Sequence, residues 1–589
     1  MDPIHPRRLA LILAAVSAPS FGQALGSLES VRVPEPPDLG KYVRDRAALG
    51  VLGKALFWDM QLGSDGRTAC ASCHFHAGAD HRAQNQFSNP NGAFEANYAQ
   101  SLSDFPFRML ADAGDNRSQV LRDSGQRAGS AGVFRRMFSG LAGAAAEDGS
   151  DASDLPAFRI GGLNVRQVTP RNTPSVFDAV FNVRNTWDGR ASSVFNGANP
   201  FGESDEHANA VVVDGGRLLP EMVRIGNSSL ASQAVGPPLN STEMSYDGRT
   251  WPTLGRKMLA LRPLALQKIA SDDSVLGDLP PSATYLTLVQ SAFQPAYWDS
   301  TQLVNGFTAA EINFSLFFGL AVQAYEATLT SVQTRFDRFS AGNSSALTTR
   351  EQAGLRVFQR SECTDCHLGP ELTSASFTNL ARQGAVQRVR TGIVTDTGFI
   401  HTGVRPSADD SGLEGADDFG VPYSAAERQG STPLGIAGAF KTPGLRNAEF
   451  TGPYFHNGGQ ATLEQVVEFY NRGGDFPNSP NLSPDVRRLN LNADERAALV
   501  EFLKALTDDR VRFERAPFDH PEICVPAGYA DSQAADPQFP GSAVDRWVSI
   551  PAVGRTGNTV PLQTFAELLQ GVGIDGSRAH NLTDACSIP

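Results

Sequence analysis

Two short segments constrain this chain more than any other feature of its sequence. Cys70-Ala-Ser-Cys73-His74 and Cys363-Thr-Asp-Cys366-His367 both spell C-x-x-C-H. In this pattern the two thiols form thioethers with the vinyl groups of a haem, and the adjacent imidazole becomes a ligand of the iron. A pair of redox or zinc C-x-x-C sites is the alternative, but it leaves both histidines unexplained. The sequence therefore predicts two covalently attached c-type haems, with His74 and His367 as iron ligands.

The amino terminus has the pattern of a secretory signal. Arg7 and Arg8 precede an apolar run from Leu9 to Val16, and small residues follow at Gly22 and Ala24. A membrane anchor is the alternative, but the apolar run is far shorter than the roughly 20 residues that a bilayer span needs. We therefore expect residues 1–24 to be a signal peptide, the mature protein to be periplasmic, and no membrane span to remain after cleavage.

The two remaining cysteines, Cys524 and Cys586, lie in a Pro- and Gly-rich tail. In an oxidising compartment one disulfide between them is the simplest interpretation. A third metal site is the alternative, and it lacks a nearby pair of histidines.

Composition excludes some classes of function. The chain has 589 residues, of which 41% are hydrophobic and 19% charged, so it carries enough apolar material for a globular core. Its formal net charge is −13 and it has no Lys/Arg-rich block, which makes nucleic acid an unsuitable partner.

The periodicity predicts a mainly α fold with two cytochrome-c-like haem domains and long irregular insertions. Apolar residues recur at helical spacing before each motif, at Leu49 to Phe57 and at Leu355 to Phe358. Further helices are predicted over 311–329, from Thr462 to the glycines at 473 and 474, and over 493–506. The predicted domains and insertions are a first haem domain over 25–345, insertions at about 83–165 and 195–230 with loops and short helices, a second haem domain over 346–510, and an extension over 511–589.

Four blocks of sequence carry a resemblance to a known family. They are LGKALFWDMQLGSDGRTACASCH, RNTPSVFDAVFNVRNTWDGRA, FDRFSAGNSSALTTREQAGLRVFQRSECTDCHLGP and KTPGLRNAEFTGPYFHNGGQATLEQVVEFYNRGG. In this order, over residues 49 to about 505, they resemble the bacterial dihaem cytochrome c peroxidase/MauG family. The segments 83–165, 195–230 and 507–589 have no counterpart in a short peroxidase, and such enlargements are similar to those of larger members, including the rubber oxygenases.

The resemblance implies catalytic residues. Trp187 matches a tryptophan that lies between the haems and helps to carry electrons, although an aromatic ring there also serves core packing. Gln233 and Glu243, in SQAVGPPLNSTEM, match a glutamine and a catalytic glutamate on the distal side of the first haem. A distal carboxylate can move a proton between the two oxygens of bound peroxide. Without the matching neighbours, Glu243 would be interpreted as an exposed loop residue.

The chain departs from the classical peroxidases at both haems. Asn164 occupies the position of a histidine that caps the first haem in those enzymes, and His76 and His81 lie so close to the proximal motif that we interpret them as surface or packing residues. An open first haem is expected. At the second haem no methionine lies beyond residue 258, and the family's ligand position, fourteen residues after His456, is Tyr470. A phenolate stabilises ferric iron.

The resemblance also implies a calcium between the haem domains, held by Asn172, Thr451 and Pro453 through oxygen atoms.

Three functions are compatible with these features. The first is a periplasmic dihaem peroxidase or MauG-like oxidase, which reduces hydrogen peroxide with electrons from a redox donor protein or an oxidisable substrate. The second is an oxygenase of the rubber-cleaving type that binds O2, with Phe195 and Phe201 lining an apolar channel, although packing explains both residues. The third is a dihaem electron-transfer protein, which the presence of Gln233 and Glu243 argues against.

Overall fold

The computed structural model describes residues 24–83, 87–88, 94–95, 100–143, 146–153, 158–388, 394–431, 435–537, 539–570 and 586. The predicted signal peptide therefore lies outside the described residues, except for residue 24. Among the helices that are described, none combines the length and the apolar character needed to cross a membrane.

The first C-x-x-C-H belongs to a cluster of helices that meet around a close helix crossing. α1 (Arg46–Trp58) leads to α2 (Ala71–His74), which carries the motif. α1 crosses α7 (Phe314–Glu326) at Gly53, where a Cβ would come within 1.9 Å of the Ala321 carbonyl oxygen. Glycine at this position therefore permits the crossing. The other helices of the cluster are α3 (Ser229–Ala234), α4 (Trp251–Ala260), α5 (Tyr285–Ala292) and α6 (Ala309–Ile312).

The apolar stretch 311–329 is helical as predicted, but the helix is interrupted at Asn313. α6 ends one residue before this asparagine and α7 begins one residue after it. The Asn313 side-chain amide donates to the carbonyl oxygens of Val211 and Tyr297, each 2.7 Å away. Asparagine side chains that bond to the backbone favour helix ends over helix interiors, which accounts for the break.

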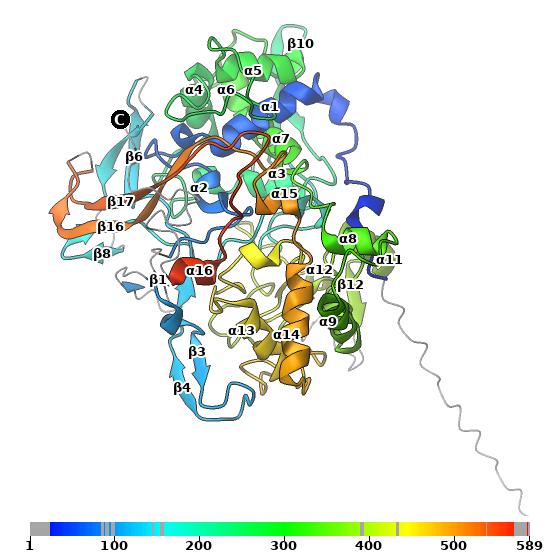
Figure 1. The fold of residues 1–589 in the computed structure, drawn as a ribbon. Coiled ribbons are helices and arrows are strands. Elements are labelled where there is room, and N and C mark those ends of the chain that lie inside the picture. The colour runs from blue at the N-terminus through cyan, green and yellow to red at the C-terminus, as the bar shows by residue number, and fades with distance from the viewer. Residues whose placement is uncertain are drawn as a thin grey trace, which may run out of the picture.

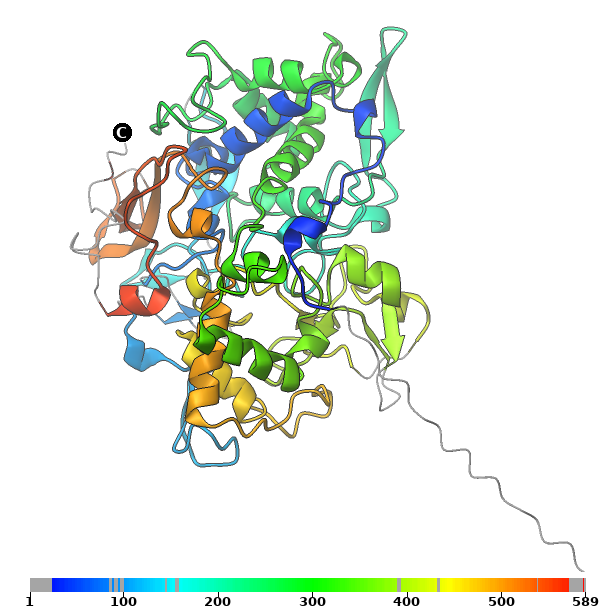
Figure 2. The same cartoon turned by 45° about the vertical axis from the view of Figure 1, so that its right-hand side comes forward.

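The second C-x-x-C-H lies in a smaller cluster with the same kind of crossing. α9 (Thr349–Arg360) leads to α10 (Cys363–Cys366) and crosses α14 (Ala493–Lys504) at Gly354, where a Cβ would lie 1.9 Å from the Ala498 carbonyl oxygen. Phe358 and Phe502 belong to a hydrophobic core distinct from that of the first cluster. The two clusters lie at opposite ends of the molecule (Figures 1 and 2). The remaining helices here are α8 (Arg335–Ser340), α11 (Phe377–Gln383), α12 (Ala425–Arg428) and α13 (Leu463–Asn471). α15 (Asp509–Arg512) packs its Val511 into the core of the first cluster.

Where loops with short helices were predicted, the structure has mainly antiparallel hairpins. The glycines at 215 and 216 both have positive φ, which suits the two-residue turn between β10 (Asn209–Asp214) and β11 (Arg217–Met222). The hairpins were not predicted, because the glycine-rich composition of these segments favours loops. The other strands here are β3 (Arg108–Leu110) with β4 (Val120–Asp123), β6 (Arg136–Leu141) with β7 (Asp148–Ala152), and β8 (Arg159–Ile160) with β9 (Leu163–Asn164).

Three further small sheets complete the strands. They are β1 (Phe87–Ser88) between β2 (Phe94–Glu95) and β5 (Arg127–Ala128), β12 (Val386–Arg388) with β13 (Val394–Asp396), and β14 (Phe399–Ile400) with β15 (Phe440–Lys441).

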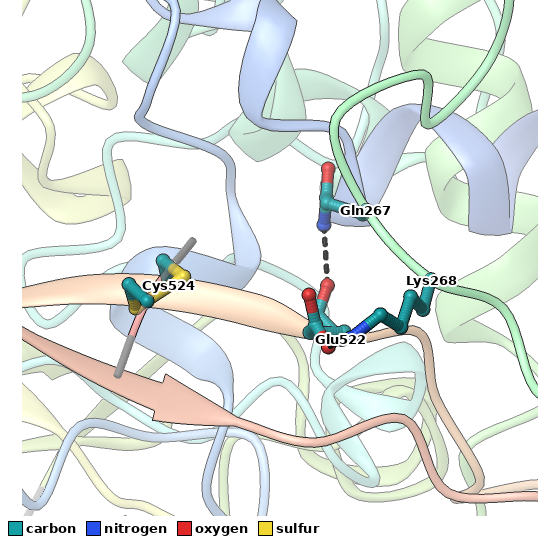
Figure 3. Close-up of a disulfide and its surroundings, with 5 residues drawn as sticks. Gln267, Lys268, Glu522 and Cys524 are labelled. Atoms are coloured by element: carbon teal, nitrogen blue, oxygen red, sulfur yellow. Dashed lines mark hydrogen bonds and ion pairs between the residues drawn. A yellow bond between two sulfur atoms is a disulfide. The ribbon is translucent and has the colours of Figure 1, made fainter. Parts of the chain in front are cut away.

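Residues after 511 fold back onto the first cluster. β16 (Ile523–Ala535) and β17 (Ala543–Ile550) form a hairpin that lies against α2, and α16 (Phe565–Leu569) follows. Cys524 and Cys586 form a disulfide. Beside it, Gln267 donates to the Glu522 carbonyl oxygen at 2.6 Å and Lys268 pairs with the Glu522 carboxylate at 3.4 Å (Figure 3).

Buried ion pairs fasten this extension to the first cluster. Lys54 of α1 is fully buried and lies 3.5 Å from the Asp519 carboxylate. Arg166 is also buried and bridges Asp65 and Asp545, with 2.8 Å to each carboxylate. The extension is therefore part of the folded body around the first motif.

Candidate functional site

The histidine of the first motif is oriented by the backbone that follows it. His74 ends the short helix α2, and its Nδ1 lies 2.8 Å from the Gly78 carbonyl oxygen. Burial lowers the His74 pKa, so the neutral imidazole is favoured. Because Nδ1 donates to the carbonyl, Nε2 keeps a lone pair for a metal. This arrangement suits the predicted iron ligand.

The second motif has the same arrangement. The Nδ1 of His367 lies 3.1 Å from the Leu372 carbonyl oxygen, and burial lowers the His367 pKa to about 4. Cys363 and Cys366, like Cys70 and Cys73, are not joined in a disulfide.

A large cavity lies beside the second motif. It has a volume of about 260 Å³ and brings together residues from distant parts of the chain. Cys363, Cys366 and His367 line it from α10, Tyr470 lines it from α13, and Trp187 lines it from the first half of the chain. Burial and the nearby cysteines raise the Tyr470 pKa. The structure therefore places Tyr470 and His367 around one space.

The cavity contains polar groups that suit a haem. Glu371 is buried, and neither of its carboxylate oxygens has a hydrogen-bond partner within the described part of the chain. Lys441 is buried in the same lining, and burial lowers its pKa to about 8. An ammonium group here suits the propionates of a haem, and the motif's thiols and imidazole supply the attachment. The donor set therefore fits the predicted group.

Sequence reasoning missed Glu371 and Lys441. Lys441 is the first residue of the fourth block that carries the family resemblance, and Glu371 directly follows the third, so these positions were the available signal.

Trp187 is held at the boundary between the two halves of the chain. Its Nε1 donates to the Asn172 carbonyl oxygen at 2.8 Å, and its own carbonyl oxygen accepts from the Lys441 backbone N–H at 2.7 Å. These bonds fix the ring beside the cavity of the second motif, where it also lies 6.3 Å from the His456 ring. The geometry accommodates both packing and electron transfer.

Gln233 and Glu243 belong to the side of the first motif. Gln233 lies near the end of α3, and Glu243 follows a tight turn in which its backbone N–H donates to the Asn240 carbonyl oxygen at 3.1 Å. Glu243 is partly exposed, yet desolvation by the surrounding protein raises its pKa. Its negative charge contributes to the raised pKa of the Cys70 and Cys73 thiols. The structure thus brings Glu243 near the first motif.

The histidines that follow the first motif are buried packing residues. The rings of His76 and His81 are stacked with centroids 3.3 Å apart, and both side chains are only 4% exposed. The Nε2 of His76 lies 2.9 Å from the Gln563 carbonyl oxygen of the extension. Asn164, at the position of the family's capping histidine, donates from its side chain to the Arg135 carbonyl oxygen at 3.2 Å.

The residues predicted for calcium line the same large cavity. These are Asn172, Thr451 and Pro453. The Asn172 Nδ2 donates to the Ala128 carbonyl oxygen at 3.3 Å. A side-chain amide oxygen is one of the ligand types that suit calcium. Within the described ranges, no group of three or more His, Cys, Asp or Glu side chains is arranged to hold a metal ion. Calcium binding stays a prediction.

The phenylalanines considered for an apolar channel are in contact with other side chains. Phe195 is fully buried in the first core, and a Cβ on Gly319 would meet its ring at 2.6 Å. The Phe201 ring faces Phe419 with centroids 6.1 Å apart. Neither contact supports a substrate channel.

Comparison with known proteins finds a family model that matches the first half of the chain. The family model described as di-haem cytochrome c peroxidase matches residues 47–124 and 144–345, which include the first motif, Trp187, Gln233 and Glu243. The match also includes most of the two segments that were predicted to be insertions.

Individual relatives match part of the chain. Cytochrome-c peroxidase IdrP1 of Denitromonas iodatirespirans is 34% identical over 190 residues, which cover 32% of this chain and 48% of the relative. The protein of that name from Pseudomonas sp. (strain SCT) is 28% identical over 268 residues, covering 44% of this chain and 64% of the relative. The chain thus spans less than two thirds of the length of either relative. The crystal structure of a MauG-like protein associated with microbial copper homeostasis has 20% identity and a TM-score of 0.45, covering 83% of this chain and 97% of that one.

Proposed function

Because this chain belongs to the family of di-haem cytochrome c peroxidases and MauG, we propose that it is an exported dihaem enzyme that reduces hydrogen peroxide. The observation that carries the proposal is the shared cavity of His367 and Tyr470 beside the second motif, with Trp187 in its wall. When bound, the two haems supply the iron at which peroxide takes up two electrons and two protons to give two molecules of water.

The residues near the first motif handle the proton and the orientation of peroxide. The Glu243 carboxylate accepts the proton from one peroxide oxygen and returns it to the other, which becomes the leaving water. Its raised pKa suits this exchange, because a group that both accepts and donates works best when its pKa is near the ambient pH. The Gln233 carboxamide orients peroxide by hydrogen bonding.

The residues near the second motif set its ligands and its electronic link to the first. His367 and Tyr470 are the residues that would hold the iron of the second haem, and Trp187 is the proposed electron relay between the halves. Asn172, Thr451 and Pro453 are the proposed calcium ligands. Electrons come from a redox donor protein or an oxidisable substrate.

The test is a comparison of two tyrosines in one cavity. Tyr454 lines the same space as Tyr470, but its hydroxyl donates to the Ala448 carbonyl oxygen at 2.8 Å. We expect Tyr470→Phe to change the low-spin EPR signal and optical spectrum of the purified ferric protein, and Tyr454→Phe to leave both unchanged. A second signal, high-spin and assigned to the first haem, is expected to respond to stoichiometric peroxide. If both haems give low-spin signals that change neither with the Tyr470 substitution nor with peroxide, the proposal is contradicted and an electron carrier is favoured.

A further inference from the structure

The helix that carries Tyr470 is held at both ends by one hairpin from the first half of the chain. This hairpin consists of β3, β4 and the turn 111–119 between them (Figure 1). It lies beside α13, far from it in sequence, and nothing in the proposed peroxide chemistry uses it.

At the N-terminal end of α13, the base of the hairpin pairs with the approach to the helix. The backbone N–H of Phe107, the residue before β3, donates to the Gly459 carbonyl oxygen at 2.9 Å. The backbone N–H of Ala128, in β5 just beyond the hairpin, donates to the Asn457 carbonyl oxygen at 2.9 Å. Phe107 and Ala128 also share a small hydrophobic core with Ala461, two residues before α13 begins. The base of the hairpin, together with β5, therefore holds the segment that leads into the helix.

At the C-terminal end, the tip of the hairpin bonds to the backbone that leaves the helix. The Asn116 Nδ2 donates to the carbonyl oxygens of Arg472, Gly473 and Gly474 at 2.7, 3.3 and 3.2 Å. The last carbonyls of a helix and of its exit lack partners within the helix, so a side-chain amide that reaches them acts as a cap. The Arg472 guanidinium donates back to the Ala113 carbonyl oxygen at 3.3 Å.

The exit from α13 makes this cap important for the position of Tyr470. Gly473 and Gly474 both have φ near +80°, and their N–H groups donate to the carbonyl oxygens of Tyr470 and Phe469 at 3.1 and 3.0 Å. The reversal that Asn116 fixes is thus bonded directly to the tyrosine's own backbone. Beyond it, the Phe476 ring packs against the guanidinium groups of Arg108, at 4.4 Å, and Arg405, at 5.3 Å.

We propose that the β3–β4 hairpin holds α13 in place at both ends. We further propose that Asn116 is a positioning residue that sets the distance and tilt of the Tyr470 phenol relative to His367. The inference rests on the proposed ligation of the second haem by His367 and Tyr470. It assigns a role in the second site to residues of the first half of the chain, so that the two halves are mechanically coupled at this ligand.

The test uses Asn116→Asp in the complete haem-loaded protein, because aspartate keeps the shape of asparagine but has no N–H to donate. We expect hydrogen exchange of the amides of residues 472–476 to become roughly tenfold faster, as the loss of about one hydrogen bond implies. We expect the low-spin EPR signal of the second haem to shift, while the signal of the first haem stays unchanged. Asn116→Gln, which keeps the carboxamide, should restore most of the wild-type signal.

Arg117→Gln is the matched control, because Arg117 is the exposed neighbour in the same turn. It should change neither measurement. If amide hydrogen exchange of residues 472–476 is unchanged in Asn116→Asp, the hairpin does not hold the end of α13. If exchange is faster but the EPR signal of the second haem is unchanged, Asn116 does not position Tyr470. If Tyr470→Phe itself leaves that signal unchanged, the proposed ligation fails instead, and the exchange measurement alone decides whether the hairpin holds the helix.

Discussion

The Glu243 carboxylate combines partial exposure with a raised pKa. Desolvation by the surrounding protein raises that pKa. As the proton acceptor for peroxide it must be ionised, so turnover in the wild type should rise with pH across this raised pKa. We predict that Glu243→Gln lowers the rate of peroxide reduction by roughly 10²- to 10⁴-fold, the usual contribution of acid–base catalysis, and removes this rise. Stopped-flow kinetics over a pH series measures both.

Glu203→Gln provides the control for that substitution. Glu203 is an exposed glutamate of the first half of the chain, in the single helical turn 202–204. Its replacement should leave the rate and its pH dependence as in the wild type. An equal loss in both variants would mean that the charge of the region, not the Glu243 carboxylate, matters.

Asp178 offers a second prediction at this scale. Its Oδ1 accepts from the Ser331 backbone N–H at 2.7 Å, and burial raises its pKa to about 6. Its folded pKa is above that of an unfolded aspartate, so the stability it contributes is fully present below about pH 4 and is lost as pH rises through about 6. Asn keeps the acceptor oxygen and cannot ionise. We predict that Asp178→Asn melts at a higher temperature than the wild type at pH 7.5, with a difference that vanishes towards pH 4.

A constant difference at all pH values would contradict this explanation, since it would show that the effect does not come from ionisation of Asp178.

Among the elements, the hairpin of β16 and β17 is anchored by the buried cation of Arg166. Arg166 lies between Asp65 and Asp545, and its guanidinium also packs against the Trp547 ring at 5.1 Å. Arg166→Met would leave two buried carboxylates without a counter-charge, which should cost about 3–5 kcal/mol of unfolding free energy. Chemical denaturation measures the loss. Arg217→Met, at an exposed position in β11, should cost almost nothing.

The elements also show how far the sequence was informative. Helices before both motifs, and the helix beginning after Thr462, follow from 3.6-residue periodicity, and the structure confirms them. Tyr470 was located by family position, and it does line the cavity with His367. The hairpins and the partners of Asn116 were not predicted. Asn116 bonds to residues more than 350 positions away, and no local pattern encodes such a contact.

For the molecule as a whole, the contribution of the Cys524–Cys586 disulfide to stability can be tested directly. Cys524 and Cys586 are 62 residues apart. Closing a loop of that length restricts the unfolded chain by at most about 4 kcal/mol in the chain-entropy model. We predict that Cys524→Ser with Cys586→Ser lowers the melting temperature in calorimetry, and that reductant reproduces the shift in the wild type only. An unchanged melting temperature would show that packing alone holds the extension.

The extension also bears on the order in which haem attachment and folding take place at the first motif. β16 lies against α2, and Arg82, which donates to the Pro526 carbonyl oxygen at 2.7 Å, also reaches Cys73. Burial raises the Cys73 pKa to about 12, and thiols react as thiolates, so the finished fold keeps this sulfur inert. The segment that covers the first motif lies further along the chain and is therefore synthesised after it. We therefore expect haem to be attached at the first motif before β16 docks against it. The cavity of the second motif contains no residue of β16 or β17, so no such order is expected there.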